Sequence, residues 1–333
     1  MKVLLVGGTG NISTGVAREA LSKGMELWLM NRGNRIDRTP PEAHQLIADL
    51  TVPETVAAAL EGHMFDAVVH FRVFNAGQMR ETIKLFRDHT KQFFLISSAT
   101  VYRKPLDHYL ITEDMPLGNI HSNYARNKLA AEEVLREAIA EGFPGVIIRP
   151  SLTYADFNPL MAINSRKHPY SIINRMRKGK PIVVHGDGTS LWTITHTSDI
   201  ARGIVGLFGN EAAIGEAFHI TSDEVLDWDR IYTLLGHAAG VDVTLVHIAT
   251  DYLGSFDPAL RESLLGDHSC SAVFDNSKIK RFVPYYESKM TFEEGAKRIV
   301  AWFDADPAAR ETVDTEWDES MDRLIAKYQS NLF

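Results

Sequence analysis

The sequence predicts an α/β fold, in which a doubly wound parallel sheet is followed by a smaller mixed α/β region. Three observations support this prediction. The chain opens on a continuous apolar run, 3–6, which is typical of a strand buried on both faces. Three glycines follow it, and then a segment with helical apolar spacing begins. Further strands and helices alternate over 26–148, which indicates a parallel sheet with helices on both faces.

The elements of the first half can be placed in order along the chain. Apolar runs bounded by turn residues mark the strands, and apolar residues spaced by three and four mark the helices. Pro53 suits the first turn of a helix, where its missing N–H would have no intrahelical partner. We expect strands at 3–6, 26–30, 45–48, 66–71, 93–96 and 146–148, and helices at 53–60, 78–89 and 123–141.

From about residue 152 the alternation loosens, which indicates the smaller mixed α/β region. Thr197-Ser198-Asp199 suits the N-cap of a helix, and Gly240 suits a C-cap. We expect helical segments at 166–177, 197–208, 228–239, 292–303 and 316–329, and strands at 182–184, 217–220 and 243–247.

Composition and charge exclude several classes of function. A formal net charge of −8 does not suit a protein that binds nucleic acid through a basic surface. The 13 histidines include no spacing typical of metal ligands, so we expect no metal site. A single cysteine excludes an internal disulfide, and no apolar run reaches the roughly 18 residues of a membrane helix. Because a strand begins at residue 2, we expect no signal peptide and a cytoplasmic protein.

The glycine turn after the first strand is the first candidate site. It reads Gly7-Gly8-Thr9-Gly10-Asn11-Ile12-Ser13 and lies between a buried strand and a helix. In that context glycines let backbone N–H groups approach a pyrophosphate, and the helix N-terminus adds a favourable dipole. Ser13 takes the third glycine position, where its small side chain suits close packing of helix on strand. The alternative is a tight turn that binds no ligand.

Tyr124 and Lys128 form the second candidate site, because residues four apart share one face of a helix. An ammonium one turn from a phenol stabilises the phenolate and lowers its pKa, which makes the tyrosine a usable acid or base. Ser98 follows a buried strand, so its hydroxyl lies at the ligand edge of the sheet. Together the three residues suit hydride transfer at a carbinol carbon, with a cofactor supplying the hydride chemistry. The alternative is an exposed tyrosine beside a solvated lysine.

With these motifs the chain resembles an extended short-chain dehydrogenase/reductase of the NAD-dependent epimerase/dehydratase family, which includes the nucleotide-sugar epimerases. The segments 111–117, 149–151, 185–188 and 196–199 are also similar to motifs of that family. The resemblance implies a Rossmann fold, with Ser98, Tyr124 and Lys128 as catalytic residues. It implies cofactor contacts from Gly7, Gly10, Asn11, Ile12, Asn31, Arg32, Asp49, Leu50, Phe71, Tyr124, Lys128 and Pro150.

The same resemblance implies that the chain is divided into two parts. Residues 1–152 are expected to form the NAD(P)-binding Rossmann domain, to which about 190–210 returns. Residues 153–189 and 211–333 are expected to bind the substrate. A homodimer through the helix 123–141 stays open, because its apolar positions are equally explained by packing on the sheet.

Three departures from the family pattern bear on ligands. Asn31-Arg32 stands where NAD enzymes place an acid for the ribose 2′-OH, so NADP is favoured over NAD. The alternative is that Arg32 points into solvent. Arg72 replaces a small residue beside the cofactor, and it could turn outward, contact a phosphate or reshape the pocket. Leu191-Trp192 occupies the place of an arginine that commonly serves nucleotide-sugar phosphates, which disfavours a diphosphate-sugar substrate.

The chemistry expected from the sequence is that of an NAD(P)-dependent epimerase or oxidoreductase acting on a sugar or sugar-nucleotide-like small molecule. Ala99-Thr100 follows Ser98 where dehydratases carry two carboxyl groups, so elimination of water is disfavoured. One alternative is an NADPH-dependent ketone or aldehyde reductase acting on a small polyol. The other is a non-catalytic NAD(P)-binding regulator, which the complete Ser-Tyr-Lys set disfavours. No nucleic-acid or membrane partner is expected.

Overall fold

The computed structural model describes residues 1–34 and 39–330, and its centre is a seven-stranded sheet. The spatial order is β12-β7-β5-β4-β1-β2-β3, and every neighbouring pair is parallel. The expected doubly wound α/β sheet is therefore confirmed. The strands are β1 (Lys2–Val6), β2 (Glu26–Asn31), β3 (His44–Ile47), β4 (Ala67–His70), β5 (Phe93–Ile96), β7 (Gly145–Ile148) and β12 (Ala217–Phe218).

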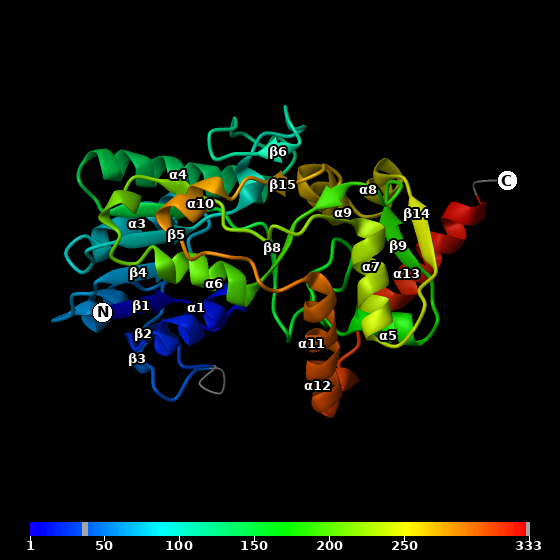
Figure 1. Ribbon diagram of the computed structural model, residues 1–333, viewed down its shortest axis with the longest axis horizontal. Helices are drawn as coiled ribbons and strands as arrows, with labels where there is room; N and C mark the ends of the chain where they lie inside the picture. The colour runs from blue at the N-terminus through cyan, green and yellow to red at the C-terminus, as the bar shows by residue number, and fades with distance from the viewer. Residues whose placement is uncertain (35–38, 331–333) are drawn as a thin grey trace.

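Helices cover both faces of the sheet, because side chains along each strand alternate between the faces. Val3 and Leu5 of β1 pack with α1 and α6, whereas Leu4 and Val6 pack with α2, α3 and α4. All four side chains are fully buried, and each such burial contributes roughly 1.5–3 kcal/mol. These helices, seen in Figure 1, are α1 (Asn11–Ser22), α2 (Pro53–Leu60), α3 (Ala76–Phe86), α4 (Asn123–Ala140) and α6 (Thr197–Gly206).

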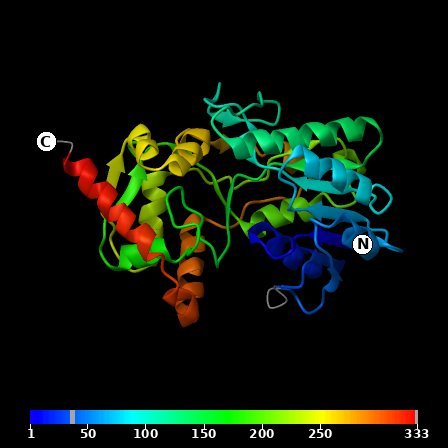
Figure 2. The same ribbon diagram turned by 180° about the vertical axis from the view of Figure 1, so that it is seen from behind.

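The second, smaller α/β region lies beyond the carboxyl ends of these strands, as Figures 1 and 2 show from opposite sides. Its core is rich in aromatic side chains, including the buried Trp192, Trp228 and Tyr232. Its longest strands, β9 and β14, pair in parallel. The elements of this region are α5 (Ser171–Arg177), β9 (Ile182–His185), α7 (Trp228–Ala238), β14 (Leu245–Ile248), α8 (Thr250–Phe256), α9 (Pro258–Ser263), the π-helical turn η4 (Leu264–His268), α11 (Phe292–Ala305), α12 (Pro307–Glu311) and α13 (Thr315–Ser330).

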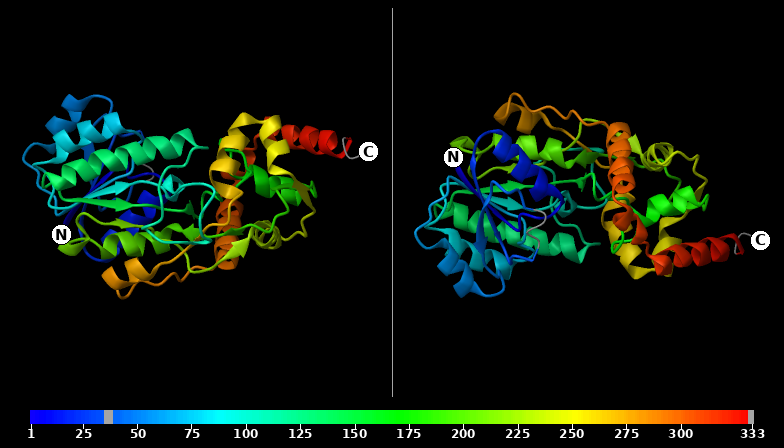
Figure 3. Two further views of the ribbon diagram at one scale, coloured as in Figure 1. Left: turned by 90° about the horizontal axis from the view of Figure 1, so that it is seen from above. Right: turned by 90° about the horizontal axis from the view of Figure 1, so that it is seen from below.

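Several short segments connect the two parts, which lie side by side in Figure 3. They include the pairs β8 (Leu152–Tyr154) with β11 (Ile194–His196), β6 (Leu110–Ile111) with β15 (Val273–Phe274), and β10 (Leu191–Trp192) with β13 (Leu226–Asp227). The turns η2 (Ala99–Val101) and η3 (Glu211–Ala213) and the helix α10 (Ser277–Phe282) complete the chain.

The return of the chain to the sheet is longer than the expected 190–210. After α6 the chain adds the edge strand β12, and later Ile279 of α10 packs into the cluster beneath α1 and α6. β12 thus joins the sheet and α10 packs on the helices that cover it, while the last residues of the chain, 331–333, lie outside the described residues.

Local contacts explain where element boundaries differ from expectation. α3 begins two residues early because Asn75 Oδ1 accepts a hydrogen bond from the Gln78 N–H at 2.9 Å and caps the helix. α5 begins late because Ser165 Oγ accepts from the His168 N–H at 3.1 Å, which holds a turn before it. Three short helices fill 250–268, where none was expected. Within the described ranges, no helix has both the length and the apolar character to cross a membrane.

The helices α1 and α6 approach each other at Gly15. A methyl group on Gly15 would lie 2.6 Å from the Thr197 carbonyl oxygen. The Thr197 hydroxyl also donates to the Asn11 carbonyl oxygen at 2.7 Å, so the start of α6 is held against the start of α1. The absence of a side chain at Gly15 lets these backbones meet.

We expect Gly15→Ala to lower the free energy of unfolding by roughly 1–3 kcal/mol, because the new methyl group forces the two helices apart. Gly77→Ala is the matched control, since its methyl group would meet only Asn75 Oδ1, at 3.3 Å. In α3 that change should be neutral or stabilising by about 0.5–1 kcal/mol. Urea unfolding of both variants measures the difference, and equal stabilities would contradict the packing described here.

Candidate active site

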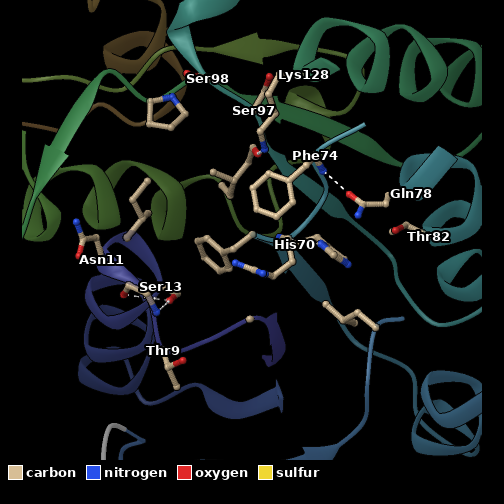
Figure 4. A pocket seen from close by; sticks show the side chains of 18 of the residues that line it. Thr9, Asn11, Ser13, His70, Phe74, Gln78, Thr82, Ser97, Ser98 and Lys128 are labelled. Atoms are coloured by element: carbon tan, nitrogen blue, oxygen red, sulfur yellow. Dashed lines mark hydrogen bonds between the residues drawn. The ribbon is translucent and has the colours of Figure 1, made fainter. Parts of the chain in front are cut away.

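A cavity of about 1100 Å³ lies at the carboxyl edge of the sheet. It lies over the ends of β1 and β4, where the strand order reverses and open α/β sheets bind ligands. In Figure 4 the glycine turn and α1 lie on one side, and Ser97, Ser98 and Lys128 lie on the other. Every site residue expected from the sequence lines this cavity: Gly7, Gly10, Asn11, Ile12, Asn31, Arg32, Asp49, Leu50, Phe71, Ser98, Tyr124, Lys128 and Pro150.

The glycine turn is tight and internally braced. Gly7 has a φ of +88°, a conformation that favours glycine. Gly10 is the N-cap of α1, and its N–H donates to Ser13 Oγ at 2.7 Å. The Ser13 hydroxyl donates back to the Gly10 carbonyl oxygen at 3.2 Å, and the side chain is buried. Serine at the third glycine position therefore fits the turn and holds its shape.

Polar side chains mark the cavity end near β2. Asn31 Oδ1 accepts from the Gly33 N–H at 2.7 Å, and its amide donates to Gln45 at 3.1 Å. Arg32 is exposed at the rim of the cavity. The Asp49 carboxylate accepts from the backbone N–H and the hydroxyl of Thr51, which lowers its pKa, and the charge of Arg32 lowers it further. One cation and one carboxylate thus lie at this end.

Arg72 lies at the cavity between the glycine turn and Phe74. Its guanidinium lies 5.0 Å from the centroid of the Phe74 ring, and its side chain covers Gly7. The Arg72 N–H donates to His70 Nδ1 at 3.2 Å, which requires that nitrogen to be unprotonated. The sequence left open whether Arg72 turns outward. This alternative is excluded, because the Arg72 side chain lines the cavity.

Ser98 is oriented by the turn that follows it. Ser98 Oγ accepts from the Thr100 N–H at 3.2 Å and from the Thr100 hydroxyl at 2.9 Å. With its oxygen engaged in this way, the Ser98 hydroxyl can donate its own hydrogen to another oxygen. Tyr124 hydrogen-bonds with Ser98, so the two hydroxyl groups are adjacent at the cavity.

Lys128 is buried beneath Tyr124 and held by the backbone. Its ammonium donates to the carbonyl oxygens of Val73, at 2.6 Å, and Ile96, at 2.8 Å. Burial lowers the pKa of Lys128 to about 8, although Glu132 opposes this shift. The ammonium lies 5.8 Å from the centroid of the Tyr124 ring.

The pKa of Tyr124 is raised, so the expected lowering by Lys128 is wrong. Burial is the main cause, although 45% of the residue as a whole is exposed. The hydrogen bond with Ser98 opposes the shift, and the negative charge of Asp267 adds to it. The lysine ammonium is engaged by two carbonyl groups, which limits its effect on the phenol.

A buried network fixes α4 on the sheet behind the cavity. Arg149 Nη2 contacts Glu132 Oε2 at 2.7 Å, and both side chains are almost fully buried. The Ser97 hydroxyl donates to Glu132 Oε1 at 2.5 Å. Arg149 therefore lies in the core, whereas Pro150 and Ser151, which follow it, line the cavity.

Four further polar residues near Tyr124 were not expected. Asp267 and His268 line the large cavity, and Arg166 and Glu262 line a smaller one beside it. Three of them come from 258–268, which has no recognisable motif, so no sequence signal marked them. In the described part of the chain, no group of three or more histidine, cysteine or acidic residues could hold a metal ion.

A glycine turn at a helix N-terminus, a serine at a strand end and a Tyr-x-x-x-Lys pair around one cavity define a Rossmann protein of the short-chain dehydrogenase/reductase type. The chain belongs to the NAD-dependent epimerase/dehydratase family, whose sequence model matches residues 3–221. The match runs from β1 through β12 and includes the glycine turn, Ser98, Tyr124 and Lys128. Members of this family are epimerases, dehydratases and reductases.

Known relatives cover most of the chain at low identity. The 2′-dehydrokanamycin reductase of Streptomyces kanamyceticus is 24% identical over 294 residues, which is 87% of this chain and 81% of that protein. Among solved structures, an epimerase from Methanothermobacter thermautotrophicus has a TM-score of 0.77 at 17% identity, covering 94% of this chain and 95% of that one. UDP-glucuronic acid 4-epimerase from Bacillus cereus, solved with NAD, has a TM-score of 0.71 at 19% identity, covering 92% and 99%. These structures share the fold of this chain.

Buried histidines make the stability of this protein sensitive to acid. Burial lowers the pKa of His70 and His268 to about 3, and that of His185 and His219 to about 4. In the unfolded chain a histidine binds its proton below a pH of about 6.5. Between these values the unfolded state therefore binds more protons than the folded state, and stability decreases as the pH falls. The Asp267 carboxyl, whose pKa burial raises to about 6, offsets part of this effect.

We expect the free energy of unfolding to decrease from about pH 6.5 to 4.5, by up to about 1.4 kcal/mol per pH unit for each buried histidine. His70→Asn keeps an acceptor for the Arg72 N–H but removes one titrating group, so the slope should decrease by about that amount. Urea unfolding at a series of pH values measures both slopes. An unchanged slope in the variant would contradict the assignment of a neutral, buried His70.

Proposed function

We propose that the protein is an NAD(P)-dependent epimerase or oxidoreductase of the extended short-chain type, acting at a carbinol carbon of a sugar-like substrate. The observation that supports this proposal best is that Ser98, Tyr124 and the glycine turn line a single cavity. The Tyr124 hydroxyl, which can transfer a proton, thus lines the same cavity as a glycine turn that suits a pyrophosphate. Elimination of water is not proposed, because neither residue after Ser98 has a carboxyl group.

The residues at the cavity fit a pyridine nucleotide. Gly7 and Gly10 present no Cβ to a ligand, and the N-terminus of α1 would favour the pyrophosphate. Asp49 and Leu50 would contact the adenine, Phe71 would lie beside the cofactor, and Pro150 would lie beside the nicotinamide. NADP is favoured over NAD, because Asn31-Arg32 at the end of β2 offers a cation where NAD enzymes place an acid for the ribose hydroxyl.

The proton chemistry is assigned to Tyr124 Oη, assisted by Ser98 and Lys128. When bound, the nicotinamide supplies hydride acceptance and return at the carbinol carbon. Ser98, whose oxygen accepts from Thr100, would donate to the substrate oxygen, and Tyr124 would take or give the hydroxyl proton. Lys128 would place a positive charge near the phenol and the cofactor. Because its pKa is raised, Tyr124 is protonated at neutral pH and is ready to act as an acid toward a carbonyl oxygen.

A reductase acting on a ketone or aldehyde of a small polyol is the second candidate. Reduction requires protonation of a carbonyl oxygen, which the Tyr124 hydroxyl can supply. The relative from Streptomyces kanamyceticus, which matches 87% of this chain, is also named as a reductase. A non-catalytic NAD(P)-binding regulator is the third candidate, and the intact set of three catalytic groups disfavours it.

The domain roles follow from this assignment. The sheet and its helices would bind the cofactor, and the region beyond the strand ends would bind the substrate. A homodimer through α4 gains no support from its apolar residues, because Val134 and Leu135 pack into the core of the same chain.

We expect Tyr124→Phe to reduce kcat by roughly 10²–10⁴-fold, because phenylalanine has no hydroxyl group to exchange a proton with the substrate oxygen. A panel of sugars and their keto forms, followed by nicotinamide absorbance, identifies a turnover to measure. Tyr285→Phe is the matched control, since that tyrosine is 62% exposed and does not line the cavity. Wild-type turnover in Tyr124→Phe would show that the acid/base assignment is wrong.

We expect Arg32→Ala to weaken NADP binding by about 10–100-fold, since a charge-assisted hydrogen bond contributes roughly 1.5–3 kcal/mol. NAD affinity should stay within about twofold of wild type, because a free ribose hydroxyl makes no such ion pair. Arg18→Ala is the control, because Arg18 is exposed on α1 and does not line the cavity. Calorimetric titration with both cofactors makes the comparison. Equal losses for NADP and NAD would refute a 2′-phosphate contact.

A further inference from the structure

A second cavity, of about 310 Å³, lies beside Tyr124. It shares Thr100, Tyr124 and Asp267 with the large cavity, so the two spaces meet at the proposed catalytic tyrosine. Its outer wall comes from α9 and η4. The polar residues that line it are Thr100, Ser122, Arg166, Glu262, Ser263 and Asp267.

Asp267 has no hydrogen-bond donor for its carboxylate within the described residues. The nearest cation is Lys104, whose ammonium lies 3.9 Å away, beyond hydrogen-bond distance. His268 Nδ1 lies 4.0 Å from the other carboxylate oxygen. Only 21% of the Asp267 side chain is exposed, and a carboxylate that is largely removed from water needs hydrogen-bond donors in addition to the ion pair that it forms with the buried Lys104. The carboxylate can therefore accept hydrogen bonds from a ligand in the cavity.

The neighbouring His268 lines the large cavity and not the smaller one. Its side chain is about nine-tenths buried, and its Nδ1 has no hydrogen-bond partner in the described structure. The ring is fixed by the neighbouring Trp192 and Trp228, whose centroids lie 5.0 and 5.4 Å away. The packed His268 ring thus holds the turn that carries Asp267, and the Asp267 carboxylate lines the smaller cavity together with Tyr124.

The other charged residues of this cavity are less suited to hold a ligand beside Tyr124. Glu262 Oε1 is engaged, since it accepts from the Asn123 N–H at 2.8 Å and the Ser122 hydroxyl at 3.3 Å. Arg166 is exposed and lines only the smaller cavity, whereas Asp267 lines both. The negative charge of Asp267 also acts directly on Tyr124. A ligand cation beside Asp267 would offset this charge at the phenol.

We propose that the smaller cavity is the substrate subsite and that Asp267 binds a protonated amine there, so that the substrate is an amino-substituted sugar or cyclitol. The proposal rests on the proposed function, because it places the reacting carbon next to Tyr124. The cavity is at the low end of the roughly 300–1,000 Å³ typical of small-molecule sites, which suits a single ring. Among the described residues that line it, Tyr124 alone is aromatic, so these residues offer no further ring for stacking a nucleobase.

Binding of three matched monosaccharides to the NADP-saturated protein tests this proposal. The probes are D-glucosamine, D-glucose and D-glucuronate, compared by ligand-observed NMR titration. We expect glucosamine to bind at least about tenfold more tightly than the other two, as a charge-assisted hydrogen bond would provide. Asp267→Asn should remove this preference and leave NADP affinity unchanged. Arg166→Gln is the matched control and should keep the preference.

The outcomes separate this inference from the proposed function. NADP affinity is measured first on the same samples, and a wild-type protein that fails to bind NADP or NAD would refute the proposed function. If the cofactor binds but glucosamine shows no preference, or binds too weakly to detect, the amine subsite is wrong. A preference for glucuronate that Arg166→Gln removes would overturn it in favour of an acidic substrate. If Asp267→Asn does not fold, the relative affinities of the wild-type protein for the three monosaccharides decide whether the amine subsite exists.

Discussion

The site depends on the parallel alignment of β1, β4, β5 and β7, which brings their carboxyl ends to one edge of the sheet. The hydrogen bonding of these strands continues into the loops that follow them. The Phe71 N–H donates to the Val6 carbonyl oxygen at 3.0 Å, and the Ala99 N–H donates to the Pro150 carbonyl oxygen at 2.9 Å. The glycine turn, Phe71, Ser98 and Pro150 are therefore held in place by the register of the sheet.

The helix α4 is fixed on this edge by polar contacts in the core. The buried Glu132–Arg149 ion pair joins α4 to the end of β7, and Lys128 donates to the carbonyl groups of Val73 and Ile96. A buried ion pair adds little net stability, but removing one partner leaves an uncompensated charge, so it specifies one position of the helix. Tyr124 lies one turn before Lys128 on the same helix, so its position is fixed by the same contacts.

The second region contributes to the same site through 258–268. Glu262 of α9 accepts hydrogen bonds at the N-terminus of α4, directly beside Tyr124. This contact satisfies N–H groups that a helix start leaves without intrahelical partners. It also fixes η4, and with it Asp267, next to the catalytic helix. The loops of the sheet thus line the part of the large cavity beside the glycine turn, while this segment lines the part beside Tyr124.

The sequence by itself determined the sheet, most of the helices that cover it and a set of residues that line the large cavity. It could do so because strand runs, the glycine turn and the Tyr124–Lys128 spacing are local patterns, and because parallel strands bring their carboxyl ends together. Only the tertiary structure decided the direction of the Tyr124 pKa, the contact of Gly15 with Thr197, and the place of Asp267 beside Tyr124. Each of these depends on burial or on contacts between segments far apart in the chain, which no local pattern encodes.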